Sequence, residues 1–155
     1  MKLTRRTLRI VPVLAIAFSA MLATPGARAA DPGSKGHGKL VFVLTTGLED
    51  LQSVGAAIKH SEHAQKSGYL DQTVLLVYGR SVQAFSQDIQ AKPPTVAKAI
   101  KEASDAGVRI VVCRIALEKF NIPEDRLESG VTEVVPNAID TLAELVSKGY
   151  QIIKY

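Results

Sequence analysis

The chain contains a single cysteine, Cys113, and Arg114 follows it directly. An ionised cysteine can attack another sulfur atom, carry a persulfide or be oxidised. The cation of Arg114 would favour the thiolate, and so would the positive end of a helix that begins here. The same cysteine could instead be buried as a small apolar residue, or be paired with a second chain. The residue and its neighbours leave these roles open.

Glycine, hydroxyl and basic residues follow several of the apolar runs along the chain. If those runs are parallel strands, a ligand would lie beyond their carboxyl ends, where these residues gather. Glycine lets a backbone approach a ligand closely, threonine offers a hydroxyl, and arginine can hold an anion. We predict a ligand-binding role for Thr45, Thr46, Gly47, Gly79, Arg80 and Asn137.

Short apolar runs alternate with helical patterns from residue 40 to residue 155. The continuous runs are typical of strands buried on both faces. The predicted strands span 40–44, 73–78, 108–113, 131–135 and 150–155, and the predicted helices span 50–67, 94–106, 115–120 and 138–148. This alternation predicts an α/β fold, a doubly wound three-layer sandwich around a mostly parallel five-stranded sheet with flavodoxin-like winding.

Residues 1–29 have the three parts of an export signal. A basic region, 2–9, precedes the apolar run 10–22, which is shorter than the roughly 20 residues of a membrane-spanning helix. Cleavage is expected between Ala29 and Ala30, and the paired arginines also resemble a twin-arginine signal. We expect export to the periplasm, a flexible leader over 30–38, one domain over 39–155 and no membrane association after cleavage; a retained anchor is the alternative.

The charge of the chain is concentrated in this signal. The whole chain carries 19 basic and 15 acidic residues, and 5 of the basic ones lie in 1–29, which leaves 14 against 15. The domain is therefore almost neutral, and the 4 Tyr and 4 Phe of the whole chain, which contains no Trp, form no stacking series. This composition argues against nucleic-acid binding.

Two histidines, His60 and His63, share one face of the first predicted helix. Two ligands do not complete a metal site, and no third ligand is evident from the sequence. We also find none of the glycine-rich fingerprints of dinucleotide binding after the first strand. We therefore predict neither a metal site nor a cofactor.

Four segments together resemble the DsrE/DsrF-like family. They are 40–47, 78–82, 107–122 and 142–150, and the third contains Cys113. In the sulfur-relay members of this family a cysteine ends the third strand, so the resemblance implies a persulfide carried on Cys113. Asn121 stands where the family has glycine, and Phe120 where it has a basic residue. Asparagine also accepts left-handed backbone angles.

Taken together with the export signal expected over 1–29, the resemblance implies an exported sulfur carrier or sulfurtransferase in which Arg114 assists Cys113. It also implies a homo-oligomer and, as a further partner, a protein that donates or accepts sulfur. The alternative is a non-catalytic oligomeric module that holds a small anion at the strand ends through Arg80 and Arg114. The two hypotheses differ in whether the thiol of Cys113 reacts.

Overall fold

The computed structural model of the protein describes residues 38–155. The predicted signal, 1–29, lies outside the described residues, and so does the predicted leader except for its last residue. That residue, Gly38, begins the first strand. Among the residues described, no helix has both the length and the apolar character needed to cross a membrane.

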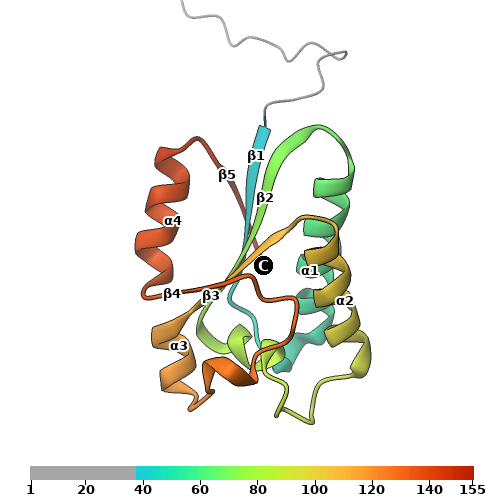
Figure 1. Ribbon diagram of the computed structural model, residues 1–155, viewed down its shortest axis with the longest axis vertical. Coiled ribbons are helices and arrows are strands. Elements are labelled where there is room, and N and C mark those ends of the chain that lie inside the picture. The colour runs from blue at the N-terminus through green and yellow to red at the C-terminus, as the bar shows by residue number, and fades with distance from the viewer. Residues whose placement is uncertain (1–37) are drawn as a thin grey trace, which may run out of the picture. The chain divides into compact units, whose positions relative to one another are not determined.

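Five parallel strands form one sheet in the order β4-β3-β2-β1-β5 (Figure 1). They are β1 (Gly38–Leu44), β2 (Leu70–Val77), β3 (Arg109–Cys113), β4 (Glu133–Val135) and β5 (Gln151–Lys154). The parallel α/β sheet predicted from the sequence is confirmed. The chain winds in one direction from β1 to β4 and then returns to the other side of β1. This order differs from the 2-1-3-4-5 order of flavodoxin.

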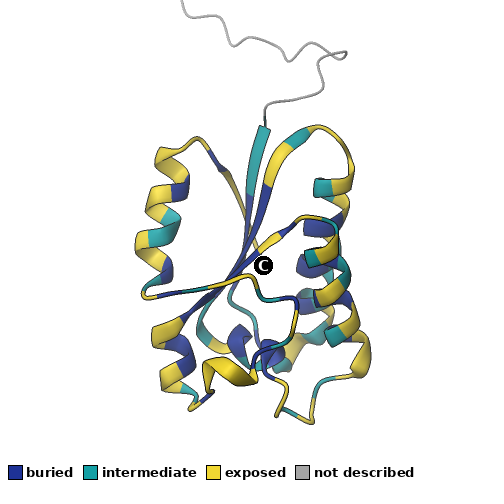
Figure 2. Cartoon of the chain, viewed as in Figure 1, coloured by how far each residue is buried: buried dark blue, intermediate teal, exposed yellow. Residues whose placement is uncertain are grey.

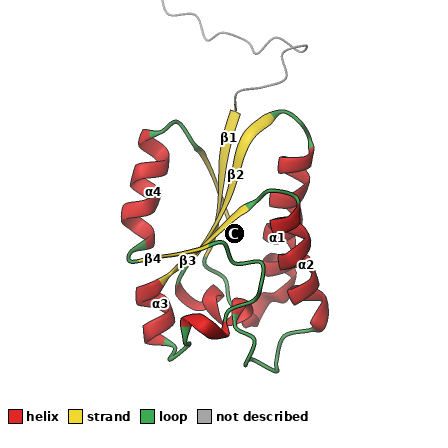
Figure 3. Ribbon diagram, viewed as in Figure 1, coloured by secondary structure: helices red, strands yellow, loops and turns green. Residues whose placement is uncertain are grey.

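Helices cover both faces of the sheet, which gives the three layers expected (Figures 1 and 3). α1 (Leu51–Lys66) and α2 (Pro94–Asp105) lie on one side, and α3 (Arg114–Lys119) and α4 (Ala138–Ser147) on the other. Three short 3-10 helices, η1 (Leu48–Asp50), η2 (Gly79–Phe85) and η3 (Glu124–Arg126), lie in the loops. η2, which follows β2, buries Val82, Ala84 and Phe85.

The ends of the helices follow from single residues. Asp50 caps α1, because its Oδ1 accepts a hydrogen bond from the backbone N–H of Ser53 at 3.0 Å. Pro94 opens α2 at a position where its missing N–H costs nothing. The predicted fourth strand is too long at its start, because the N–H of Val131 bonds to the carbonyl of Glu128 at 2.9 Å in a turn and β4 begins only at Glu133.

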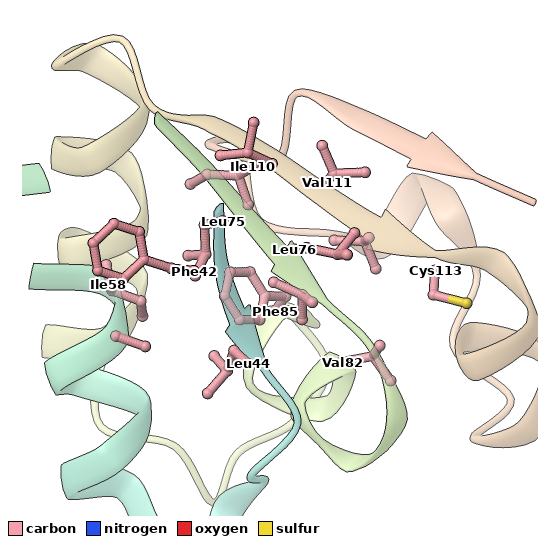
Figure 4. Packing of buried hydrophobic residues seen from close by; sticks show 14 of the residues in the cluster. Phe42, Leu44, Ile58, Leu75, Leu76, Val82, Phe85, Ile110, Val111 and Cys113 are labelled. Carbon is pink, nitrogen blue, oxygen red and sulfur yellow. The ribbon is translucent and has the colours of Figure 1, made fainter. Parts of the chain in front are cut away.

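The core lies on both faces of the three central strands (Figures 2 and 4). Every residue from Val74 to Val77 on β2 is buried, as continuous apolar runs of parallel strands require. β5 differs, because all four of its residues are exposed. The helices therefore cover the middle of the sheet, whereas its β5 edge is exposed to solvent.

Outside the apolar core, α1 and α2 are joined by a chain of charges. The side chain of Glu62, which is 8% exposed, accepts hydrogen bonds from Lys59 Nζ at 3.0 Å and Lys66 Nζ at 2.6 Å. Lys59 also reaches Glu102 of α2 at 2.6 Å. The hydrogen bonds from Lys66 and Lys59 hold the pKa of the Glu62 carboxyl below its usual value.

Replacing Glu62 by glutamine should therefore destabilise the protein in a pH-dependent way. A carboxyl whose pKa is lowered on folding stabilises the fold above its unfolded pKa, and this contribution disappears as the pH falls through the folded pKa. Because both lysines are half-exposed, we expect a loss of about 1 kcal/mol at pH 7 that closes below about pH 4. Urea unfolding at several pH values measures it. Asp105→Asn, which removes an exposed partner of Lys101, is the control; an equal loss there, or a pH-independent loss for Glu62→Gln, contradicts the prediction.

Candidate functional site

The loops that follow β1 and β2 lie against each other at the carboxyl edge of the sheet. The N–H of Tyr78 bonds to the carbonyl of Leu44 at 3.2 Å, and the hydroxyl of Ser81 donates to the same carbonyl at 2.8 Å. A Cβ atom on Gly47 would lie 2.8 Å from Cβ and 3.0 Å from the carbonyl oxygen of Arg80. The parallel sheet thus brings together Thr45, Thr46, Gly47, Gly79 and Arg80, as the sequence predicted they would lie.

Backbone geometry accounts for the glycine that follows β2. Gly79 has a φ angle of +67°, a left-handed conformation that glycine adopts without strain. Its Cα faces the carbonyl oxygen of Thr45, which a Cβ atom would approach to 3.8 Å. Gly79 is therefore required by the turn itself.

The hydroxyl of Thr45 is engaged within the fold. Both its Oγ1, at 3.2 Å, and its backbone N–H, at 3.1 Å, donate to the carbonyl of Tyr155. The ring of Tyr155 stacks on Phe42, and its hydroxyl lies 2.5 Å from Nδ1 of His60. Thr45 thus anchors the chain after β5.

Asn137 does not lie with these loops. It follows β4, which stands at the far edge of the sheet from β1 and β5. Its Oδ1 accepts a hydrogen bond from the N–H of Ile139 at 2.9 Å and so caps α4. Asn137 therefore lies apart from the loops after β1 and β2, because the strand order places β4 at the opposite edge of the sheet from β5.

Both arginines of the predicted site face a carboxylate. Arg80 lies 3.7 Å from Glu49, and Arg114 Nε donates to Glu124 at 2.6 Å. The hydrogen bond and charge of Glu124 raise the pKa of the Arg114 guanidinium. The pKa of Glu49 is lowered, mainly by backbone hydrogen bonds in its own loop and also by Arg80. The sequence analysis missed these two glutamates, because nothing in their spacing marks them as partners.

Hydrogen bonds and an ion pair between two loops hold Glu124 in place. The N–H of Gln87 bonds to the carbonyl of Arg126 at 2.8 Å, and its side chain donates to the carbonyl of Leu127 at 2.6 Å. The Arg126 guanidinium also binds Asp88 at 2.5 Å. The loop that carries η3 is therefore fixed against the end of η2.

Cys113 ends β3, pairs in register with Val135 of β4 and immediately precedes α3. It is 5% exposed and belongs to the hydrophobic cluster. Figure 4 shows it at the border of that cluster, with the sulfur atom on the side away from Leu76. The sequence left several roles open for this thiol. In the structure it is buried, between the core and the first turn of α3.

The next two residues, Arg114 and Ile115, are exposed beside the buried sulfur. The side chain of Cys113 makes no capping hydrogen bond to α3. Since the Arg114 guanidinium is bound by Glu124, the cation next to the thiol is already paired. Nothing in the sequence indicated that Glu124 would be its partner.

The two histidines of α1 have different neighbours. His60 contacts Tyr155, whereas Nδ1 of His63 lies 2.8 Å from the carbonyl oxygen of Lys59. Within residues 38–155, no group of three or more His, Cys, Asp or Glu side chains is placed to hold a metal ion.

These features define a class of protein: an α/β sandwich with a parallel sheet, whose one cysteine ends the third strand at the carboxyl edge of that sheet. Residues 38–155 match the DsrE/DsrF-like family, and the chain belongs to that family. The resemblance noted in the sequence is thereby confirmed for the family and its fold. Asn121, at the position of the family's glycine, has a φ of +51°.

Solved structures show the same fold at low sequence identity. A protein of unknown function from Methanobacterium thermoautotrophicum is 15% identical, with a TM-score of 0.59 over 77% of this chain and 99% of its own. A conserved protein of unknown function from Bacteroides thetaiotaomicron is 20% identical, with a TM-score of 0.58 over 76% and 94%. The ychN protein of E. coli is 12% identical, with a TM-score of 0.62 over 76% and 99%. A comparison with curated proteins found no match.

Replacement by alanine should have opposite effects at Gly47, which packs against Arg80, and at Gly55, which has open space beside it. Gly47→Ala would push a methyl group into the Arg80 backbone, so we expect a loss of about 1–3 kcal/mol in unfolding free energy. Gly55→Ala in α1 meets nothing within 4 Å and should stabilise the helix by about 0.5–1 kcal/mol. Urea unfolding of both variants checks this, and a neutral Gly47→Ala would show that the two loops do not pack as described.

Proposed function

We propose that this DsrE/DsrF-like protein handles sulfane sulfur as a persulfide on Cys113. The observation that carries the proposal is the position of this cysteine: it ends β3 at the carboxyl edge of the sheet, directly before a helix. Family membership over residues 38–155 supports it, because a cysteine in this position carries sulfur in the relay members that the sequence resembles.

The chemical step needs a donor that contains a sulfur–sulfur bond, such as an inorganic polysulfide. The Cys113 thiolate attacks the terminal sulfur of the donor and forms a new S–S bond. The donor's own S–S bond breaks, and its electron pair leaves with a polysulfide that is one sulfur shorter. The thiol proton goes to solvent, so no external oxidant or reductant is needed.

The charges at the strand ends favour this function over a module that binds a small anion. Such a module would need cations that are free to meet the ligand. Arg80 and Arg114 instead face Glu49 and Glu124. An anion held by these arginines would have to displace the carboxylates, whereas covalent transfer of sulfur to Cys113 does not require either arginine to hold the donor.

We further propose that residues 1–29 direct the protein to the periplasm and are removed there. The support lies in the sequence, which has a basic region, an apolar run over residues 10–22 and small residues before Ala30. The sulfur donor and acceptor would then be periplasmic as well. The intact mass of the protein recovered from a periplasmic fraction reports where its chain begins.

The direct test of the sulfur proposal is intact mass before and after incubation with inorganic polysulfide. We expect the protein to gain the mass of one sulfur atom, to lose it on treatment with a thiol reductant, and to show no gain as Cys113→Ser. Blocking the thiol beforehand should also abolish the gain. If the folded protein gains no sulfur and is alkylated only after unfolding, Cys113 is a packing residue and the proposal fails.

The ion pair of Arg114 predicts how the reactivity of the thiol can be raised. In Glu124→Gln the guanidinium keeps its charge but loses its partner, so it can stabilise the nearby thiolate. We expect the alkylation rate of Cys113 near neutral pH to rise roughly twofold or more, measured with a thiol-blocking reagent.

The control is Glu133→Gln, which breaks the equivalent pair with Arg109 at the other end of β3. Its alkylation rate should equal that of the wild-type protein, with the pH profile unchanged. Equal rates in all three proteins would show that Arg114 has no influence on Cys113.

A further inference from the structure

One ion pair among residues 38–155 is buried at both ends. Nζ of Lys92 lies 2.5 Å from Oε1 of Glu128, and the two side chains are only 7% and 13% exposed. In every other ion pair of these residues the basic side chain is at least 44% exposed. Moving two charges out of water is costly, and apolar side chains often fill such a place as favourably. A gain in stability alone therefore does not account for this pair.

The ammonium group of Lys92 joins two loops. Lys92 lies between η2 and α2, whereas Glu128 lies between η3 and β4. Nζ of Lys92 also donates a hydrogen bond to the carbonyl of Ser86, which is 1% exposed and forms a β-bridge with Leu127. Lys92 thus closes its own loop and binds it to the segment that follows η3.

Glu128 is fixed against the core by its backbone as well as by its side chain. Its N–H bonds to the carbonyl of Phe85 at 2.8 Å. Two residues later, a Cβ atom on Gly130 would lie 2.7 Å from the carbonyl oxygen of Ile100. Phe85 and Ile100 are both fully buried. The buried ion pair therefore lies where the η3 loop meets the rigid part of the molecule.

The same loop carries Glu124, four residues before Glu128 (Figure 1). Glu124 begins η3, a 3-10 helix of 3 residues that buries none of them. Such a short helix has no interior hydrogen bonds to spare, so its position depends on the points where its ends are attached. Oε1 of Glu124 accepts a hydrogen bond from Nε of Arg114 at 2.6 Å, and Arg114 follows Cys113 directly.

Glu124 is the charge near Arg114 that a movement of the η3 loop can displace. The other acidic neighbour, Glu118, lies one turn further along α3 on the same helix face as Arg114 and stays with that helix. On β4, the residue in register with Cys113 is the uncharged Val135. The position of the η3 loop therefore decides whether the guanidinium beside the thiol is paired with Glu124.

We infer that Lys92 and Glu128 are positioning residues for Cys113, because they hold the η3 loop where Glu124 pairs with Arg114. The inference rests on the proposed role of Cys113, since it concerns the reactivity of that thiol. With the buried pair intact, the carboxylate of Glu124 offsets the guanidinium charge. With the buried pair removed, the loop is released, and the guanidinium can stabilise the thiolate.

The test is the rate at which iodoacetamide alkylates Cys113, measured over a pH range around the ordinary thiol pKa of about 8.5. Lys92→Met combined with Glu128→Gln removes both charges and leaves no unpaired charge in the interior. We expect the midpoint of the pH profile to move to lower pH, and the rate near neutral pH to rise roughly twofold or more. Glu128→Gln alone, which keeps a hydrogen-bond acceptor for Lys92, should move the midpoint in the same direction. Thermal unfolding confirms that each variant is folded.

A second ion pair between the same two loops supplies the control. Arg126 and Asp88 are 49% and 48% exposed, so solvent screens their attraction. Asp88→Asn should leave the midpoint of the alkylation profile unchanged. If the Lys92 and Glu128 variants raise the rate at high pH without moving the midpoint, the thiol has only become more accessible. That result overturns the inference, and so does an equal shift of the midpoint in Asp88→Asn.

Combining these variants with Glu124→Gln tests whether the buried pair acts through Glu124. If it does, the changes at Lys92 and Glu128 should move the midpoint no further once Glu124 is glutamine. Additive shifts would contradict the inference, because the buried pair would then act on the thiol by another route.

Intact mass after incubation with inorganic polysulfide separates this inference from the proposed function. A protein that gains no sulfur but shows the expected shifts in its alkylation profile refutes the proposed function and leaves the positioning role in place. A protein that gains one sulfur atom on Cys113 while the Lys92 and Glu128 variants keep the wild-type profile refutes the positioning role alone.

Discussion

The parallel pairing of the five strands is the constraint on which the other features depend. Parallel neighbours can be joined only by crossovers, and these crossovers place helices on both faces. The strands must then be apolar throughout, as β2 is from Val74 to Val77. The same pairing collects all strand ends at one edge, so the loops after β1, β2 and β3 meet there although they are far apart in the sequence. Cys113 owes its place at that edge to this arrangement.

At this edge, most of the polar groups that could bind a ligand already serve the fold. Thr45 holds the chain after β5, Ser81 joins two loops, and Asn137 caps a helix. Two arginines are paired with glutamates. A backbone that ends several strands in one place needs these partners, because unpaired polar groups there would cost free energy. The thiol of Cys113, by contrast, is buried at the border of the apolar core and makes no capping bond to α3.

Most of the fold was predictable from local patterns, because buried strands and capped helices have characteristic residues. The strand order was not, since it depends on which crossovers pack against which face. This is why the loop residues from Thr45 to Arg80 lie together as expected while Asn137 does not. The ion pair of Arg114 with Glu124 depends on the bonds between two loops, and these bonds leave no pattern in the sequence. The helix over 138–148 was also predictable, but the spacing of its apolar residues alone does not show that the sheet buries Ala138 and Leu145 and leaves Ile139 and Val146 exposed.

The burial of Cys113 is compatible with sulfur chemistry because of what lies around it. The thiol directly precedes α3, a helix of only 6 residues in which Ala116 and Leu117 are buried. The residue that follows the cysteine, Arg114, is tied to Glu124 in the neighbouring loop. An opening that exposes the sulfur would strain or break this pair and free the guanidinium beside the thiolate. Access to the thiol and the positive charge that stabilises its ionised form would then arise from one local movement.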